Sequence, residues 1–316
     1  MFSDSTRPHH SMNKSGISVV LATYNGERFL RKQIDSIIYQ TLAPEEILVG
    51  DDRSDDDTAK ILQEYQTALK VHVNATRLGA VINFKTIASK VNQANYIAFA
   101  DQDDIWLPGK LALSLDHLQK FQKPDLPAMV YSDPKIINDQ DELISPSLWA
   151  LLGIDQYPHT LDTILFGNPV SGCTMLVNPA LAKYIDTIPD DFSINHDAWL
   201  TLCAYTFGRA VVLPEQVILY RQHGNNLTFS TAHQPAGRLK KRISELVNSI
   251  SGRDDLFVQQ FKLVRRFYET FKEGLPREKK KIIETFLGLE NAGYMRKKLA
   301  FRAACKRASK IRSNKG

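Results

Sequence analysis

Between residues 17 and 110, short apolar runs alternate with segments that repeat at helical spacing, and this alternation limits the fold more than any other feature. The apolar runs predict four strands, at 17–22, 45–50, 70–74 and 96–100. The intervening segments predict three helices, at 27–40, 58–69 and 81–94. Strands that alternate with helices form βαβ units, which build a parallel sheet with right-handed crossovers. The sequence therefore predicts an α/β fold with a mostly parallel central sheet flanked by helices.

Further elements follow beyond residue 110, where the alternation weakens. Three more helices are predicted, at 110–121, from Pro179 onward, and at 196–207. Four more strands are predicted, at 128–133, at 171–178 and as a final pair within 210–220. From residue 234 no strand pattern appears, and the sequence predicts three or four charged amphipathic helices. We therefore expect a domain boundary near 230–235.

Three of the predicted strands end in polar loops that are rich in carboxylates. The loops are TYNGE at 23–27, DDRSDDD at 51–57 and DQDD at 101–104. Because ligands of open α/β sheets bind beyond the carboxyl ends of the strands, we expect the loops to converge. Any one acidic loop could be solvated surface, but three at equivalent strand ends favour a shared ligand. Asp101, Asp103 and Asp104 repel each other, and a bound cation or open water would relieve that repulsion.

The chemistry of these loops points to a metal ion and a nucleotide diphosphate. The sequence has neither a GxxxxGK[ST] phosphate loop nor a GxGxxG motif after the first strand. A glycine-rich nucleotidyltransferase loop is also absent there. Paired carboxylates suit a hard divalent cation that bridges phosphates and neutralises a departing diphosphate. The D-x-D pair of Asp101 and Asp103 therefore predicts a metal and nucleotide site.

Five segments, in order, resemble the motifs of the family 2 glycosyltransferases, which have the GT-A fold. The first three are VVLATYNGERFLRKQIDSIIYQT, EEILVGDDRSDDDT and YIAFADQDDIWLPGKL. The last two, NHDAWL and YRQHGNN, resemble the later motifs of a bacterial subgroup that includes many rhamnosyltransferases. The resemblance covers residues 17–227 and implies a GT-A catalytic domain at 17–230. Residues 1–16 are then a flexible leader, and 231–316 form a basic helical C-terminal region.

The resemblance implies donor-binding roles for the three loops. The nucleobase and ribose would be surrounded by Thr23, Tyr24, Asn25 and Glu27. Asp51 would contact the base, with Asp52 close by. Asp101 would lie near the ribose and the metal, with Gln102 also among the donor-binding residues. Asp103 would be the principal metal ligand and would bridge the ion to the diphosphate.

Residues around these loops receive further roles from the resemblance. Asp104 and Trp106 would shape the loop and the sugar pocket, although core packing explains Trp106 equally well. Arg221 would clamp a phosphate through its fork of donors. His223 would complete the metal shell or donate to the diphosphate. The implied cofactor is Mn²⁺ or Mg²⁺, held by Asp103, Asp101 and His223.

The catalytic base implied by the resemblance is Asp197 in NHDAWL. An inverting transfer needs a carboxylate that takes the acceptor hydroxyl proton as that oxygen attacks the anomeric carbon. The alternative for Asp197 is an N-cap of the predicted helix, and a structural role is open for His196. Gly172 would allow close backbone approach near the acceptor, or form a plain turn, and Cys173 would serve packing.

Charge is distributed unevenly along the chain. Residues 231–316 contain 22 Lys and Arg against 8 Asp and Glu, whereas residues 1–230 contain 18 against 27. The segment 295–316 has nine basic residues and no acidic one, with Met295, Leu299 and Ala303 at helical spacing. This pattern predicts an interfacial helix on an anionic membrane surface. A solvated tail or a face against another subunit, such as a homodimer, stays open, whereas no nucleic-acid-binding motif is present.

The function expected is an inverting, metal-dependent glycosyltransferase. It would move a sugar, L-rhamnose from dTDP-rhamnose, to a hydroxyl of a bacterial surface polysaccharide or lipid-linked glycan. The alternatives are a UDP-hexose donor, a sugar-nucleotide pyrophosphorylase, or a catalytically silent partner that binds glycan or lipid. No apolar run of 18 residues and no signal-peptide core occur, and the three cysteines are far apart. We therefore expect a cytoplasmic protein at the inner face of the cell membrane.

Overall fold

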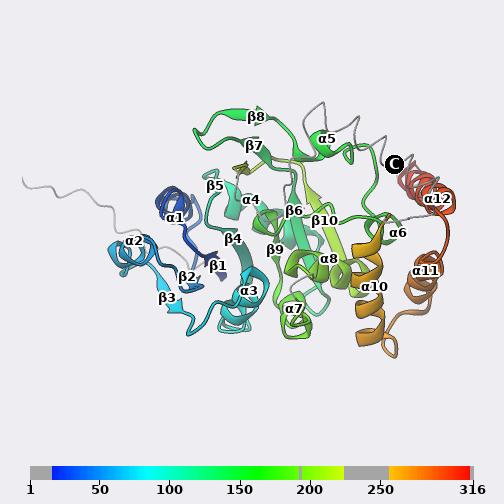
Figure 1. The fold of residues 1–316 in the computed structure, drawn as a ribbon, viewed down its shortest axis with the longest axis horizontal. Coiled ribbons are helices and arrows are strands. Elements are labelled where there is room, and N and C mark those ends of the chain that lie inside the picture. The colour runs from blue at the N-terminus through cyan, green and yellow to red at the C-terminus, as the bar shows by residue number, and fades with distance from the viewer. Residues whose placement is uncertain (1–15, 192–193, 224–255, 314–316) are drawn as a thin grey trace, which may run out of the picture.

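The computed structural model describes residues 16–191, 194–223 and 256–313, which form an α/β structure (Figure 1). The large sheet has seven strands in the order β10-β6-β9-β4-β1-β2-β3. These strands are β1 (Ile17–Thr23), β2 (Glu46–Asp51), β3 (Lys70–Val73), β4 (Tyr96–Asp101), β6 (Ala128–Ser132), β9 (Leu176–Val177) and β10 (Arg209–Leu213). Neighbouring strands pair in parallel except at β9, which is antiparallel to both β4 and β6. The predicted mostly parallel α/β sheet is thus confirmed.

Helices and a second, smaller sheet complete the part of the chain before residue 224. The small sheet has the order β5-β11-β7-β8. Its strands are β5 (Ile105–Trp106), β7 (Lys135–Ile137), β8 (Leu143–Ser145) and β11 (Ile218–Arg221). The longer helices are α1 (Leu30–Ile38), α2 (Thr58–Glu64), α3 (Ala80–Ala88), α4 (Lys110–Phe121) and α8 (His196–Phe207). Shorter turns of helix are α5 (Leu148–Leu152), α6 (Leu161–Ile164), η1 (Gly172–Thr174), α7 (Pro179–Ala182) and η2 (Ile185–Thr187).

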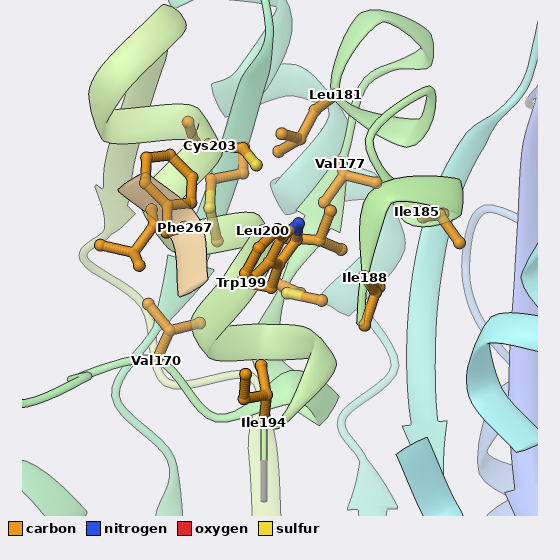
Figure 2. Close-up of a cluster of buried hydrophobic side chains, with 14 of the residues drawn as sticks. Val170, Val177, Leu181, Ile185, Ile188, Ile194, Trp199, Leu200, Cys203 and Phe267 are labelled. Carbon is orange, nitrogen blue, oxygen red and sulfur yellow. The ribbon is translucent and has the colours of Figure 1, made fainter. Parts of the chain in front are cut away.

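Alternation of side chains along β1 explains why helices cover both faces of the large sheet. Leu21 belongs to one hydrophobic cluster and its neighbour Val20 to another, because successive strand residues point to opposite faces. The first cluster contains Ile34 of α1. The second contains Trp199 of α8 and Phe267 of the C-terminal helix α10 (Figure 2). The sheet therefore lies between two apolar layers, and its strand ends stay available for a site.

Some predicted elements differ from those in the structure. Of the run predicted as a strand at 171–178, only β9 is a strand, because η1 turns the chain to bring Gly172 against α8. The pair predicted within 210–220 does not pair with itself, since β10 joins β6 and β11 joins β5 and β7. Helix α1 begins at Leu30 rather than at 27, because residues 25–27 bond to the neighbouring loop. Helix α3 ends at Ala88, well short of the predicted residue 94.

Within residues 256–313, three helices pack onto the α/β core. They are α10 (Val258–Phe271), α11 (Arg277–Leu287) and α12 (Tyr294–Ser313). The ring of Phe267 in α10 lies 5.5 Å from that of Trp199 in α8, and Phe261 stacks on Phe286 of α11 at 4.6 Å. These helices thus extend the hydrophobic layer that covers α8. The predicted boundary at 230–235 and residues 1–15 of the predicted leader lie outside the described residues.

Candidate active site

The ends of β1, β2 and β4 meet at one edge of the large sheet. The register pairs Thr23 with Asp51 and Ala22 with Asp101 across neighbouring strands. The backbone N–H of Asp52 also donates to the carbonyl of Thr23 at 2.9 Å. The convergence of the three polar loops that the sequence predicts is therefore confirmed.

Side chains of the first loop are bonded to the second loop. The Asn25 amide donates to Asp55 Oδ1 at 2.7 Å and accepts from the Asp55 N–H at 3.0 Å. Glu27 Oε2 accepts from the Asp57 N–H at 3.0 Å, while the Glu27 N–H donates to Asp56 Oδ2 at the same distance. Asn25 has a φ of 49°, a left-handed conformation that asparagine tolerates better than most residues. Asn25 and Glu27 therefore fix the spacing between the two loops.

Asp52 is a buried carboxylate whose hydrogen bonds all come from its own chain. Its Oδ1 accepts from the Asn74 amide at 2.9 Å and from the Leu78 N–H at 2.7 Å. Its Oδ2 accepts from the Gly79 N–H at 2.7 Å. Only 2% of the Asp52 side chain is exposed, and three donors offset the cost of burying its charge. Asp52 thus holds the start of α3 against β2.

Asp51 is equally buried and has a different set of partners. Its carboxylate accepts from the backbone N–H of Ser54 at 3.3 Å, and the Ser54 hydroxyl donates to the same Oδ1. The Ser54 hydroxyl oxygen in turn accepts from the Asn25 N–H at 2.9 Å. Asp51 therefore stands at the floor of the first two loops, where the sequence places the base-contacting residue.

Gln102 links the third loop to the first. Its Oε1 accepts from the Thr23 hydroxyl at 2.6 Å and from the Tyr24 N–H at 2.8 Å, and its Nε2 donates to the Tyr24 carbonyl at 3.1 Å. A Cβ added to Gly26 would lie 2.4 Å from Gln102 Oε1, so a larger residue there would displace the Gln102 side chain. The guanidinium of Arg77 lies 3.9 Å from the centre of the Tyr24 ring. Gln102 thus holds the backbone of Tyr24, and Arg77 packs on its ring.

The carboxylates after β4 lie close together with little compensation. Burial and the charges of Asp103 and Asp197 raise the pKa of Asp101 to about 7. Burial and the charges of Asp103 and Asp101 raise the pKa of Asp104 well above its ordinary value. One oxygen each of Asp101 and Asp104 and the Cys173 sulfur all lie within 4.8 Å of one another. A cation at this loop would relieve the repulsion.

The predicted metal ligands fall into two neighbouring groups. Asp103 Oδ2 lies 2.7 Å from His223 Nε2, so these two members of the predicted set are together. Asp101 instead groups with Asp104 and Cys173, although the charge of Asp103 reaches it. Carboxylate oxygens and an imidazole nitrogen are ligands that Mn²⁺ and Mg²⁺ accept. These ligand types fit a divalent cation at Asp103 and His223, and a contribution of Asp101 to the same ion stays a prediction.

Arg221 lies beneath the D-x-D loop, and its side chain has no exposed surface. Its Nε donates to the carbonyl of Asp103 at 2.7 Å, and its NH1 donates to the carbonyl of Asn138 at the same distance. The same NH1 lies 2.6 Å from Asp141 Oδ1. A phosphate contact by Arg221 stays a prediction, and it would require the guanidinium to leave these partners.

Asp197 lies in the first turn of α8 and faces the D-x-D loop, since it contributes to the raised pKa of Asp101. Burial raises the pKa of Asp197 to about 6, although backbone N–H groups of Ala198 and Gly172 hydrogen-bond the carboxylate. The N-cap of α8 is Asn195, so the alternative of an N-cap role for Asp197 is wrong. A carboxylate at this place can accept a proton close to the donor site.

Gly172 and His196 surround Asp197 closely. A Cβ on Gly172 would lie 2.6 Å from His196 Nε2 and 3.7 Å from Asp197 Cβ, so the backbone at Gly172 lies close against α8, and an approach to the acceptor stays a prediction. The His196 ring packs between Phe84 at 4.3 Å and Phe99 at 4.9 Å. Burial lowers the pKa of His196 to about 3, so the ring is neutral. This packing supports the structural role of His196.

Trp106 is buried beneath the D-x-D loop. Only 2% of its side chain is exposed, and Lys110 Nζ lies 3.6 Å from the centre of its ring. Lys110 is itself fully buried, and burial lowers its pKa to about 7. The structure thus supports core packing for Trp106, and contact with the sugar stays a prediction.

Several residues at the site were not identified from sequence. Arg77 lies in a loop with no motif, and Phe29 contacts the rings or guanidinium groups of its neighbours Arg28, Arg221 and His223. Lys110 stands within the matched motif YIAFADQDDIWLPGKL, which was the one signal available for it. The turn of β7 and β8 that contacts Arg221 has no sequence signal of its own.

Comparison with known proteins bears on the fold and the family. The model of glycosyl transferase family 2 matches residues 18–172, about half of the chain. The chain is 26% identical to the dTDP-rhamnosyl transferase RfbG of Shigella flexneri over 75% of its own length and 86% of that protein. It is 32% identical to the UDP-Glc:alpha-D-GlcNAc-diphosphoundecaprenol beta-1,3-glucosyltransferase WfgD of Escherichia coli over 124 residues, 39% of this chain and 47% of that one.

The fold has relatives among solved structures. The mannosyltransferase PcManGT from Pyrobaculum calidifontis, in complex with GDP-Man and Mn²⁺, superposes with a TM-score of 0.55 at 16% identity. The match covers 96% of this chain and 76% of that one. The convergent loops, the D-x-D carboxylates and these similarities agree with one another. The chain is therefore a glycosyltransferase that carries a glycosyl transferase family 2 domain in a GT-A fold.

Proposed function

We propose that this glycosyltransferase transfers L-rhamnose from dTDP-rhamnose to a hydroxyl group of a bacterial surface polysaccharide or lipid-linked glycan, with inversion at the anomeric carbon. The observation that supports this donor most directly is the similarity to a dTDP-rhamnosyl transferase over 75% of the chain. Such a donor presents a nucleobase, a deoxyribose, a diphosphate and a sugar. The three loops offer residues for each of these parts.

The nucleotide end of the donor would lie over the first two loops. Thr23, Tyr24 and Asn25 would surround the base and deoxyribose, with Asp51 at the floor, and Glu27 would hold this loop to the second. Gln102 holds the backbone of Tyr24 and Arg77 packs on its ring, so the residue is ordered before the nucleotide arrives. Asp52 supports this pocket from below through its bonds to the start of α3.

The diphosphate would lie at the D-x-D loop. Asp101, Asp103 and His223 would hold Mn²⁺ or Mg²⁺, whose positive charge would stabilise the departing diphosphate. Asp104 is fully buried, and its Oδ1 accepts from the Arg221 N–H at 3.0 Å, so we assign it to the support of the loop. The closeness of the Asp101 and Asp104 carboxylates supports a cation here, together with burial and the charges of Asp103 and Asp197, which raise the pKa of Asp101 to about 7.

Asp197 would act as the general base. With a pKa of about 6 it is mostly ionised at neutral pH, and it is basic enough to take a proton in the transition state. The hydrogen bonds from Gly172 and Ala198 orient its carboxylate. The acceptor hydroxyl would lose its proton to Asp197 as its oxygen bonds to the anomeric carbon and the nucleotide diphosphate leaves. His196 is neutral and packed between rings, so we assign it a structural role.

A UDP-hexose donor is the second candidate. The segment similarity to a UDP-Glc-dependent glucosyltransferase favours it, although that match covers 39% of the chain. The test is release of the nucleoside diphosphate from dTDP-rhamnose, UDP-glucose, UDP-galactose, UDP-GlcNAc and GDP-mannose, each with and without Mn²⁺ and with a lipid-linked glycan acceptor. We expect metal-dependent turnover of dTDP-rhamnose and a product of inverted anomeric configuration. Turnover of a UDP-hexose alone would establish the second candidate.

An anionic membrane surface is proposed as the partner of α12. Met295 and Leu299 lie one turn apart on this helix, with 59% and 56% of their surface exposed. Arg302 and Lys306 are exposed on the following turns, so an apolar stripe is flanked by positive charge. The opposite side of the helix is buried, as at Ala304. Among the described residues, none of the helices offers a stretch long and apolar enough to span a bilayer.

The membrane proposal is tested by sedimentation with vesicles that contain anionic lipid. Changing Met295 and Leu299 to Ser removes the apolar stripe without touching the buried side of α12, and we expect bound protein to fall severalfold. Leu126→Ser, at an exposed position outside α12, is the control for loss of exposed apolar surface elsewhere. Equal sedimentation of the Met295/Leu299 variant and the native chain would refute the proposal.

A further inference from the structure

Arg221 joins the D-x-D loop to a turn that belongs to the second sheet. Its guanidinium bonds the Asp103 carbonyl through Nε and the Asn138 carbonyl through NH1, each at 2.7 Å. The NH1 atom also pairs with Asp141 Oδ1 at 2.6 Å. The face of the guanidinium lies 4.4 Å from the centre of the Phe29 ring. Because Arg221 is fully buried and has these partners, its side chain forms part of the protein interior.

The backbone around Arg221 holds the same loop from a second direction. The Arg221 N–H donates to Asp104 Oδ1 at 3.0 Å, so strand β11 bonds the residue that follows Asp103. Two residues later, His223 Nε2 lies 2.7 Å from Asp103 Oδ2. One short segment therefore fixes the carbonyl of Asp103, the carboxylate of Asp104 and the carboxylate of Asp103.

The turn that receives Arg221 is rigid in itself. Asn138 Oδ1 accepts from the N–H groups of Gln140 and Glu142, both at 2.9 Å. Asp141 has a φ of 67°, a left-handed conformation that places its carboxylate toward Arg221. Lys32 of α1 pairs with the other oxygen of Asp141. The turn is thus a fixed support between α1 and β11.

We propose that Arg221 and Asp141 are positioning residues for the metal-binding loop. The buried guanidinium of Arg221 bonds the backbone of Asp103 and is held by the partly exposed carboxylate of Asp141, so that the Asp103 carboxylate and His223 are held together where the metal and the diphosphate would bind. The inference rests on the proposed metal role of Asp103. It contrasts with a phosphate contact by Arg221, which would require the side chain to leave three partners inside the protein.

The turn offers a matched pair of substitutions. Asp139 lies two residues from Asp141 and pairs with Arg28 at 2.8 Å, but this pair is at the surface and does not reach Asp103. Asp141→Asn and Asp139→Asn make the same chemical change in the same turn. Asparagine tolerates a φ of 67° as aspartate does, so Asp141→Asn leaves the backbone unstrained. Arg221→Lys removes the planar fork while keeping the charge.

The experiment measures Mn²⁺ binding to each variant by electron paramagnetic resonance in the presence of dTDP. It also measures dTDP binding without metal and the His223 imidazole resonance in metal-free protein. We expect Asp141→Asn and Arg221→Lys to weaken Mn²⁺ binding by about tenfold or more, as outer-shell changes do at other metal sites. Both should shift the His223 resonance and leave metal-free dTDP binding within about twofold of the native value. Asp139→Asn should change none of these, as expected of a surface ion pair.

Two results would overturn the proposal. One is equal behaviour of Asp141→Asn and Asp139→Asn in Mn²⁺ binding and in the His223 resonance. The other is a loss of metal-free dTDP binding in Arg221→Lys with no effect of Asp141→Asn, which would make Arg221 a phosphate ligand. If native protein shows no Mn²⁺ effect on dTDP binding, the proposed metal role fails, and the His223 resonance in metal-free protein still decides the positioning role. Thermal unfolding of each variant confirms that folded protein is compared.

Discussion

The loop at 51–57 and the loop at 101–104 are both acidic and both follow a strand of the large sheet, yet they treat their carboxylates differently. In the first, buried Asp52 accepts three hydrogen bonds from its own chain. In the second, burial and like charges raise the pKa of Asp101 to about 7 and also raise the pKa of Asp104. An acidic loop that supplies its own donors needs no cation, whereas one that concentrates unmatched charge is suited to bind one.

Substitution of Asp197 should have the largest effect, because Asp197 is the proposed base and lies close to the carboxylates of the D-x-D loop. We expect Asp197→Asn to lower the turnover number by about a thousandfold, the scale of general-base catalysis, while donor binding is unchanged. The pKa of Asp197 is raised in the folded protein, so ionisation of Asp197 lowers the free energy of unfolding as the pH rises from about 4 to about 6. The variant lacks this charge and should be at least as stable as the native chain at pH 7. Rapid-quench assays measure the turnover number, and calorimetry measures donor binding and unfolding. Retention of most of the turnover would exclude Asp197 as the base.

Asp52→Asn should act on stability instead of binding. An asparagine amide would place a donor against the N–H of Leu78 or Gly79, so we expect the free energy of unfolding to fall by about 2 kcal/mol. Metal-dependent donor binding should persist. Denaturant unfolding provides the measurement, with Asp55→Asn in the exposed part of the same loop as the milder control. A stable Asp52→Asn variant that no longer binds the donor would show that Asp52 takes part in donor binding and not in stability alone.

The pH dependence of kcat/KM should follow the ionisation of Asp197. Asp197 is active as a base when ionised, and its pKa is raised to about 6. We therefore expect kcat/KM to fall about tenfold for each pH unit below about 6 and to level off above it. The profile of the Asp55→Asn variant should be the same. A flat profile from pH 7 down to pH 5 would contradict the assignment of Asp197.

The smallest effect is expected at Glu27, which ties the first loop to the second. Glu27→Ala removes the acceptor for the Asp57 N–H, and we expect the free energy of unfolding to fall by about 0.5–1 kcal/mol. The KM for the donor should change by less than about threefold. A large rise in KM without loss of stability would make Glu27 a direct donor ligand rather than a tie between loops.

Two helices were predicted from sequence to the residue, whereas α1, α2 and α3 are shorter than predicted. Helices α4 and α8 begin and end where the pattern places them, because helical spacing of apolar residues is a local property. Strands β5, β7 and β8 were missed, since each has two or three residues and is stabilised by partners elsewhere. Trp106 of β5, for example, pairs with Ile218 of β11. Strands of two or three residues are too short to show the alternation of apolar and polar residues that predicts a strand.

The site shows the same division. Convergence of the three loops was predictable because it follows from parallel strands alone. The burial of Arg221 was not, since its partner Asn138 lies 83 residues away in a turn that sequence reasoning did not identify. The difference between Asp52 and Asp101 was also hidden, because it depends on backbone N–H groups that point at one carboxylate and not at the other.

The most direct test of the contrast between the two loops is calorimetric titration of dTDP-rhamnose with and without Mn²⁺ into native protein, Asp103→Asn and Asp52→Asn. We expect Mn²⁺ to strengthen binding to the native protein and to the Asp52 variant, and to have no effect on the Asp103 variant. A Mn²⁺ effect that survives in Asp103→Asn and disappears in Asp52→Asn would place the cation at the other loop and contradict the account.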